Sequence, residues 1–232
     1  IELGLKGTFL EGKLRLGGNI FYQRFEDHQV QQTNQTPAAL AGLFGSFFLA
    51  ATTNAEKVET YGIEADATYL LGDHWDISLR AAYADPTVDE WTSRFCPNGE
   101  EESPDQLYCP KGDGDDLNNL PKFNTNFQVG YSRSLDSGWD FYSRGTWTWQ
   151  SEPDETRLTN DFSEPKNLLG FSMGAGHSGM GIDIRVWGKN LTDEDLNIDP
   201  GTKSNGDPSL PAAWRGGQTP GREFGVTMRY QF

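Results

Sequence analysis

The last eleven residues read Arg222-Glu-Phe-Gly-Val-Thr-Met-Arg-Tyr-Gln-Phe232, and their pattern indicates the class of fold. Apolar side chains occupy every second position, namely Phe224, Val226, Met228, Tyr230 and Phe232, and the positions between them are small or polar. A period of two is typical of a β-strand, because successive side chains of a strand point to opposite faces. This stretch therefore predicts a strand with one apolar and one polar face.

The same period recurs along most of the chain. Eight further segments show it: residues 1–9, 14–22, 61–69, 75–83, 123–131, 139–149, 169–175 and 182–186. Short turns at 11–13, 72–74, 136–138 and 178–180 alternate with long segments at 26–56, 84–122, 152–166 and 191–221. This order predicts an all-β, antiparallel up-and-down meander of nine strands with unlike rims, which is typical of an outer-membrane barrel. A β-sandwich usually mixes loop lengths at both ends.

Charge is distributed unevenly between the predicted strands and the long segments. The chain has 34 acids and 19 lysines and arginines, and the long segments hold 23 of these acids but only 7 of the bases. Within the strands, charged residues such as Glu64, Asp66 and Arg80 occupy one face. The uncharged face indicates contact with hydrocarbon, where a charge costs about 2–4 kcal/mol. A soluble sheet with one buried face predicts the same alternation.

Aromatic residues gather at both ends of the predicted strands. Tyr69, Trp75 and Trp139 flank short turns, and Tyr22, Tyr83, Trp147 and Trp149 stand at the ends that lead into long segments. Two aromatic girdles around an apolar band are expected where lipid headgroups meet hydrocarbon. Soluble cores also bury aromatic rings, so a single ring indicates little. Taken together, the rings favour contact with lipid.

The composition excludes several classes of protein. A net charge of −15 argues against a nucleic-acid-binding protein, which needs a basic surface. The longest mostly apolar run, residues 38–51, is shorter than the ~20 residues of a spanning helix. Aromatic residues make up 12% of the chain, far more than a disordered chain carries. No signal peptide precedes Ile1, so we expect the chain to be a piece of a longer protein.

Two motifs carry a family resemblance. The C-terminal strand resembles the closing strand of bacterial outer-membrane proteins, which ends in Phe with an aromatic residue two positions earlier. Upstream, Val186-Trp-Gly-Lys-Asn-Leu-Thr-Asp193 is similar to the penultimate-strand motif of TonB-dependent receptors. The segment that follows, with Pro200-Gly201 and Pro220-Gly221, and the stretches 58–69 and 120–126 are also similar to those receptors.

The resemblance implies a fold, a place and an activity. Such receptors are barrels of about 22 strands with a plugged lumen, so residues 1–232 would be about nine C-terminal strands of a partial transmembrane β-barrel, without the plug. It also implies the outer membrane of a Gram-negative bacterium and TonB-dependent uptake of a scarce ligand, such as a ferric siderophore. The implied partners are TonB, through the absent plug region, membrane lipid and lipopolysaccharide, a small-molecule ligand such as a ferric chelate, and the barrel-assembly machinery that reads the closing strand.

Aromatic and cationic residues in the long segments are candidates for ligand contact. They are Phe44, Phe47, Phe48, Trp91, Arg94, Trp214 and Arg215. Rings and guanidinium groups can hold a ferric chelate by stacking and charge, although each of these residues can equally anchor its own loop. The apolar run 38–51 can form a short helix over the mouth, contact a ligand or pack on the neighbouring barrel wall.

The most acidic long segment holds the two cysteines and an aspartate cluster. We expect Cys96 and Cys109 to form a disulfide in the oxidising periplasm, where closing a loop of this size contributes about 3 kcal/mol in the chain-entropy model. Asp113-Gly-Asp-Asp116 has the carboxylates that calcium prefers but lacks the EF-hand spacing. A solvated acidic turn is the expected structure there, and we expect no metal site.

No catalytic constellation is apparent in the sequence. His28, His74 and His177 are scattered and have neither a nucleophile motif nor zinc-ligand spacing around them. We therefore expect neither an enzyme nor a cofactor. Two alternatives to a receptor stay open: a passive porin-like or structural barrel, and a soluble carbohydrate-binding β-domain.

Overall fold

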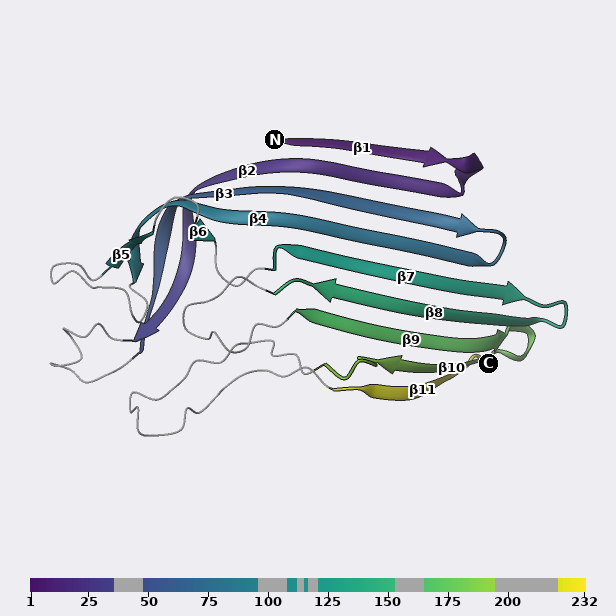
Figure 1. Cartoon of the computed structure of the whole chain (residues 1–232). Coiled ribbons are helices and arrows are strands. Elements are labelled where there is room, and N and C mark those ends of the chain that lie inside the picture. The colour runs from purple at the N-terminus through teal and green to yellow at the C-terminus, as the bar shows by residue number, and fades with distance from the viewer. Residues whose placement is uncertain (36–47, 96–107, 112–114, 117–120, 153–164, 195–220) are drawn as a thin grey trace.

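The computed structural model describes residues 1–35, 48–95, 108–111, 115–116, 121–152, 165–194 and 221–232. These residues form one antiparallel sheet whose strands lie side by side in chain order, β1-β2-β3-β4-β7-β8-β9-β10-β11 (Figure 1). Its strands are β1 (Glu2–Phe9), β2 (Leu14–Gln35), β3 (Phe48–Leu71), β4 (Trp75–Phe95), β7 (Phe123–Ser134), β8 (Trp139–Gln150), β9 (Lys166–His177), β10 (Ile182–Lys189) and β11 (Glu223–Tyr230). The nine-strand antiparallel meander is confirmed.

Short turns close the strand pairs at one end of the sheet (Figure 1). Two of them are single 3-10 turns, η1 (Leu10–Gly12) between β1 and β2, and η2 (Ser178–Met180) between β9 and β10. After η2, Gly181 takes a φ of 64°, which glycine adopts without the steric cost of a Cβ atom. Its carbonyl accepts the backbone N–H of Gln231 at 2.8 Å, so the C-terminal tail is tied to this rim.

Three strands are much longer than a bilayer requires. β2, β3 and β4 have 22, 24 and 21 residues, whereas a transmembrane strand needs about 9–11. Their extra length lies beyond the aromatic residues Tyr22, Tyr61 and Tyr83, at the end remote from the short turns. Figure 1 shows the three strands curving there, and a β-bulge shifts the β3–β4 register beside Lys57.

This length corrects one expectation from the sequence. Residues 26–35, 48–56 and 84–95 were expected in long connections, but they continue β2, β3 and β4. The apolar run 38–51 is likewise not a single loop, because residues 48–51 belong to β3 and 38–47 lie outside the described residues. Outside the membrane neither face of the strands contacts lipid. The alternation of apolar and polar residues is therefore lost there, although the backbone pairing continues. Two short strands also pair with β4, namely β5 (Tyr108–Lys111) and β6 (Asp115–Asp116).

The register gives the sheet two unlike faces. Apolar side chains of neighbouring strands lie opposite one another, as with Ile20 and Ile63, or Val186 and Val226. These side chains are exposed, between 43% and 70%. The only buried apolar side chains in the described part of the chain are Ala55, Val58 and Val88, beyond the girdle. An apolar face left uncovered by protein is what a barrel wall presents to lipid. No helix among the described residues is long and apolar enough to cross a bilayer.

Candidate functional site

The polar face of the sheet encloses a hollow of about 640 Å³, here called the inner trough. It spans the strands from β1 to β8, and its polar lining consists of Glu2, Lys6, Asn19, Glu64, Asp66, Arg80, Asn124, Asn126, Thr148 and Gln150. All charged members belong to the face that the sequence predicted to be polar. The trough is thus the side of the wall that faces water or a polar partner.

Amide side chains form a connected ladder along one side of this face. Asn126 donates to the hydroxyl of Thr148 at 2.8 Å, and Gln128 donates to Asn126 at the same distance. The ladder continues from Gln128 to Arg144, which donates to Gln128 at 3.3 Å and pairs with Asp76 at 3.4 Å. Because amides both donate and accept, such a ladder can bind polar groups of either kind without carrying net charge.

Charged residues of both signs line the trough. Asp66 on β3 and Arg80 on β4 are register partners, and Asn19 on β2 donates to Glu2 on β1 at 2.8 Å. The wall therefore offers both signs of charge within one hollow. In contrast to the acidic long segments, it has no strong preference for a ligand or partner of one sign.

A polar cluster closes the outer end of the apolar face. Asp85 stands opposite Tyr61 in the β3–β4 register and is only 8% exposed. Its carboxylate accepts hydrogen bonds from Tyr61 and Tyr83 and pairs with Lys122 at 2.9 Å. The two tyrosines belong to the predicted girdle, so their hydroxyl groups and the ammonium group satisfy a carboxylate at the boundary of the hydrocarbon region.

The sequence predicts Asp85 in the long acidic segment 84–122, and this prediction is wrong, because Asp85 lies within β4. The alternation of the strand could have predicted this position. Asp85 continues the odd-numbered series of outward side chains that runs from Ile77 to Tyr83. The charge obscured this pattern, since a lone aspartate looks incompatible with a lipid-facing position until its three partners are known.

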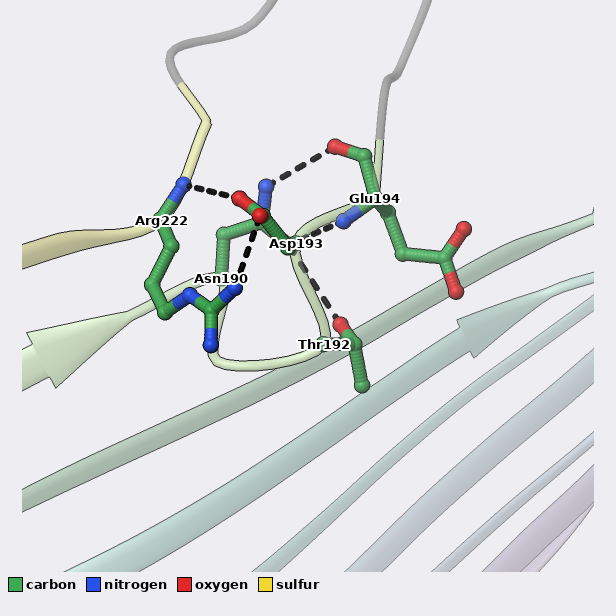
Figure 2. A network of polar contacts seen from close by, with 5 residues as sticks. All are labelled: Asn190, Thr192, Asp193, Glu194 and Arg222. Carbon is green, nitrogen blue, oxygen red and sulfur yellow. Dashed lines mark hydrogen bonds and ion pairs between the residues drawn. The ribbon is translucent and has the colours of Figure 1, made fainter.

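A second polar network ties the end of β10 to the beginning of β11 (Figure 2). The turn after β10 is held by Asn190, which donates to the carbonyl of Glu194 at 2.9 Å and accepts its N–H at 3.0 Å. Thr192 donates to the carbonyl of Asn167 at 2.7 Å, which fastens the turn to β9. Asp193 then accepts two hydrogen bonds from Arg222, at 2.9 Å from the backbone N–H and at 2.7 Å from the guanidinium group.

This network accounts physically for the Asn-Leu-Thr-Asp motif at 190–193. Asn190 and Asp193 both have positive φ, at 47° and 58°, a conformation that Asn and Asp tolerate better than most residues. The side chain of Asn190 satisfies the backbone of the turn, and that of Asp193 is left free to hold Arg222. The backbone N–H and the guanidinium group of Arg222 both lower the pKa of the Asp193 carboxyl.

Most predicted ligand-contact residues fall in parts of the chain where the structure gives no side-chain positions. Phe44, Phe47, Trp214 and Arg215 lie outside the described residues. Phe48 is the first residue of β3, and Trp91 and Arg94 lie in the distal part of β4, where their backbones pair with β5. Whether these seven residues lie together is therefore not tested, and their role stays a prediction.

The remaining predicted sites are placed as follows. Phe224, Val226, Met228 and Tyr230 lie on the exposed apolar face of β11, and Phe232 follows it. Cys96 and Asp113 lie outside the described residues, so the disulfide stays a prediction, and of the expected acidic turn Asp115 and Asp116 instead form β6 beside β4. The backbone of Cys109 pairs with Arg94, two residues before Cys96 in the chain. Among the described residues, no three His, Cys, Asp or Glu side chains gather as metal ligands.

A two-faced antiparallel sheet, with an uncovered apolar face, aromatic girdles and a polar trough, defines part of an outer-membrane β-barrel. The chain belongs to the TonB dependent receptor-like, beta-barrel family, whose model matches residues 1–193. Members of this family are outer-membrane transport proteins of Gram-negative bacteria rather than enzymes. The soluble-domain alternative therefore does not fit this chain.

One solved structure with the same fold is that of the copper transporter OprC. The two chains superpose with a TM-score of 0.62 at 17% sequence identity, over 100% of this chain and 30% of OprC. The chain thus spans less than a third of the length of that transporter. No curated protein matches the sequence.

Proposed function

We propose that residues 1–232 are the C-terminal part of the barrel of a TonB-dependent receptor, which takes up a scarce ligand across the outer membrane. The observation that carries this proposal is the family match over residues 1–193, which the polar trough on the inner face supports. In such a receptor the extracellular segments capture the ligand, a plug held inside the barrel shifts, and the wall lines the path. TonB acts through the plug region, which is not in this chain.

We further propose a ferric siderophore as the ligand. Guanidinium groups and aromatic rings of the long segments, such as Arg94 and Trp91, are suited to stacking on a chelate and to binding its oxygen atoms. The same segments carry 23 acids against 7 bases, which lowers the local concentration of anions. A ferric chelate of neutral or positive net charge therefore fits this chain better than a strongly anionic one.

Uptake by cells that lack the full-length gene tests both parts of the proposal. Deletion should abolish accumulation of ⁵⁵Fe from a neutral or cationic siderophore, and removal of TonB from the parent strain should have the same effect. Copper salts, cobalamin and oligosaccharides are the comparison ligands. Loss of copper uptake alone would retain the receptor and reject the siderophore, whereas normal uptake of every ligand would reject the receptor.

A passive porin is the alternative that requires its own measurement. The purified full-length protein in a planar bilayer should show no steady ion conductance, because a plugged barrel blocks the lumen. Large conductance without TonB, together with normal energy-dependent uptake in the deletion strain, would favour the porin. The other proposed partners are lipid and lipopolysaccharide at the outer wall, and the assembly machinery at Phe224–Phe232.

A further inference from the structure

The last two strands are neighbours in the sheet although a long connection separates them. β10 ends at Lys189 and β11 begins at Glu223, so no short turn sets their relative position. A slip of one residue would turn every side chain of β11 to the other face, and long connections specify register weakly. Nevertheless, the apolar side chains of β11 must reach lipid for the wall to be complete. This requirement excludes a slip of one residue but not a slip of two, which keeps the faces, so some other feature has to select among these registers.

We propose that a register lock selects it, formed by Trp187, Gly188 and Asp193 on the β10 side and by Arg222, Phe224 and Gly225 on the β11 side. The lock has two parts, a crossed pair of aromatic and glycine residues and the Asp193–Arg222 clamp of Figure 2. It concerns assembly of the barrel and does not depend on which ligand is transported.

The crossed pair places each aromatic ring over a glycine of the opposite strand. Trp187 is the register partner of Gly225, and Gly188 is the register partner of Phe224, so the two rings lie on opposite faces of the sheet. The indole of Trp187 occupies the space that a side chain at position 225 would need. A Cβ atom at position 188 would lie 3.0 Å from the ring of Phe224 and 2.7 Å from Leu191.

Slipped registers lose this fit on both faces. A slip of one residue would pair Trp187 with Phe224 or Val226 in place of Gly225, and a slip of two would pair it with Glu223 or Thr227. In each case a side chain would meet the indole. In the observed register the indole N–H also donates to the hydroxyl of Thr227 at 3.2 Å. Aromatic rings that cover cross-strand glycines are a known device for pinning register.

The clamp acts at the point where β11 begins. Thr192 fastens the 190–194 turn to β9. Asp193 therefore has a fixed position along the strand direction, relative to β9 and β10. Its two hydrogen bonds to Arg222 then place the residue immediately before β11. The clamp and the crossed pair specify the same register independently. The clamp does so through hydrogen bonds, and the crossed pair through the packing of aromatic rings on glycines.

Disulfide trapping in the full-length receptor, in membranes and with Cys96 and Cys109 replaced by serine, measures the register. A cysteine pair at Val186 and Val226 reports the observed register, and a pair at Ile184 and Val226 reports a slip of two residues. In the otherwise unchanged protein the first pair should form at least about tenfold more disulfide. Gly225→Val should reduce this preference at least fivefold, and Arg222→Ala combined with Gly225→Val should reduce it further.

The exchange Trp187→Gly with Gly225→Trp is the decisive variant, because it moves the ring to the other strand and keeps the pairing. It should restore both the native cross-link and the amount of protein in the membrane, even if Gly225→Val alone is degraded. The control is Gly145→Val, since a side chain at Gly145 would meet no atom within 4 Å. An unchanged preference in Gly225→Val, or an exchange variant without the native cross-link, would overturn the proposal.

Discussion

Tyr61 and Asp85 face each other across β3 and β4 at the outer rim of the apolar face, and the Tyr61 hydroxyl donates to Oδ2 of Asp85 at 2.5 Å. Tyr83 donates to the same oxygen at 3.1 Å, and Lys122 pairs with the other oxygen. Three side chains from three parts of the chain thus bind one carboxylate. This arrangement explains why an acidic residue is stable at the end of a lipid-facing series.

Replacing this carboxylate should therefore destabilise the barrel. Asp85→Ala removes the acceptor that the hydroxyl groups of Tyr61 and Tyr83 share, at a position that is itself only 8% exposed, and the loss of these hydrogen bonds should cost about 1–3 kcal/mol. Urea unfolding of the full-length protein in detergent, followed by tryptophan fluorescence, measures this change. Asp136→Asn, in an exposed short turn, is the control and should have little effect. Equal stability of Asp85→Ala and the parent protein would show that the cluster contributes nothing.

A charge on the outer wall should be far more costly than the same charge on the inner wall. Leu79 lies midway between Trp75 and Tyr83 on the apolar face, whereas its neighbour Ser78 faces the polar side. Leu79→Lys should lower the free energy of unfolding in liposomes by about 2–4 kcal/mol, because the bilayer midplane solvates an ammonium group poorly. Ser78→Lys should change it by only about 0.5 kcal/mol. Similar losses for both variants would contradict the assignment of the faces.

The Asp193–Arg222 clamp should make part of the stability dependent on pH. Hydrogen bonds and charge from Arg222 hold the pKa of Asp193 below its ordinary value of 3.8. The ionised carboxylate therefore stabilises the folded state fully above that value, and this contribution is lost as the pH falls through the lowered pKa. Asp193→Asn should reduce the thermal midpoint near pH 7, and the difference from the parent should shrink at a pH below the lowered pKa. A difference that is equal at both pH values would exclude this linkage, and Asp73→Asn is the exposed control.

The disulfide between Cys96 and Cys109 can be tested directly on the purified full-length protein. Without a reductant both thiols should resist alkylation, and after reduction the mass should increase by two alkyl groups. Reduction should also lower stability by about 3 kcal/mol in the chain-entropy model, because the open chain gains conformational freedom when it unfolds. Cys96→Ser serves as the control with one free thiol. Two reactive thiols in the untreated protein would disprove the pairing.

The sequence predicted the wall of the barrel well, because lipid imposes a simple rule on it. Between the two aromatic girdles each outward side chain must be apolar, so alternation alone places residues such as Ile63 and Leu79 correctly. Beyond Tyr22 and Tyr61 that rule no longer applies. The continuation of β2 and β3 depends on backbone pairing between distant segments, as between Gln29 and Asn54, and backbone pairing leaves no period in the sequence.

The strand order, the two faces, the short-turn rim and the family of this protein could all be predicted from the sequence, since they follow from local periodicity and motifs. The partners of Asp85, the length of β2–β4 and the fit of Trp187 over Gly225 became known from the structure alone. These features bring together residues far apart in the chain, such as Asp193 and Arg222, which are 29 positions apart. Their contacts depend on register between strands, and register is set by the side chains that two strands bring together rather than by either strand alone.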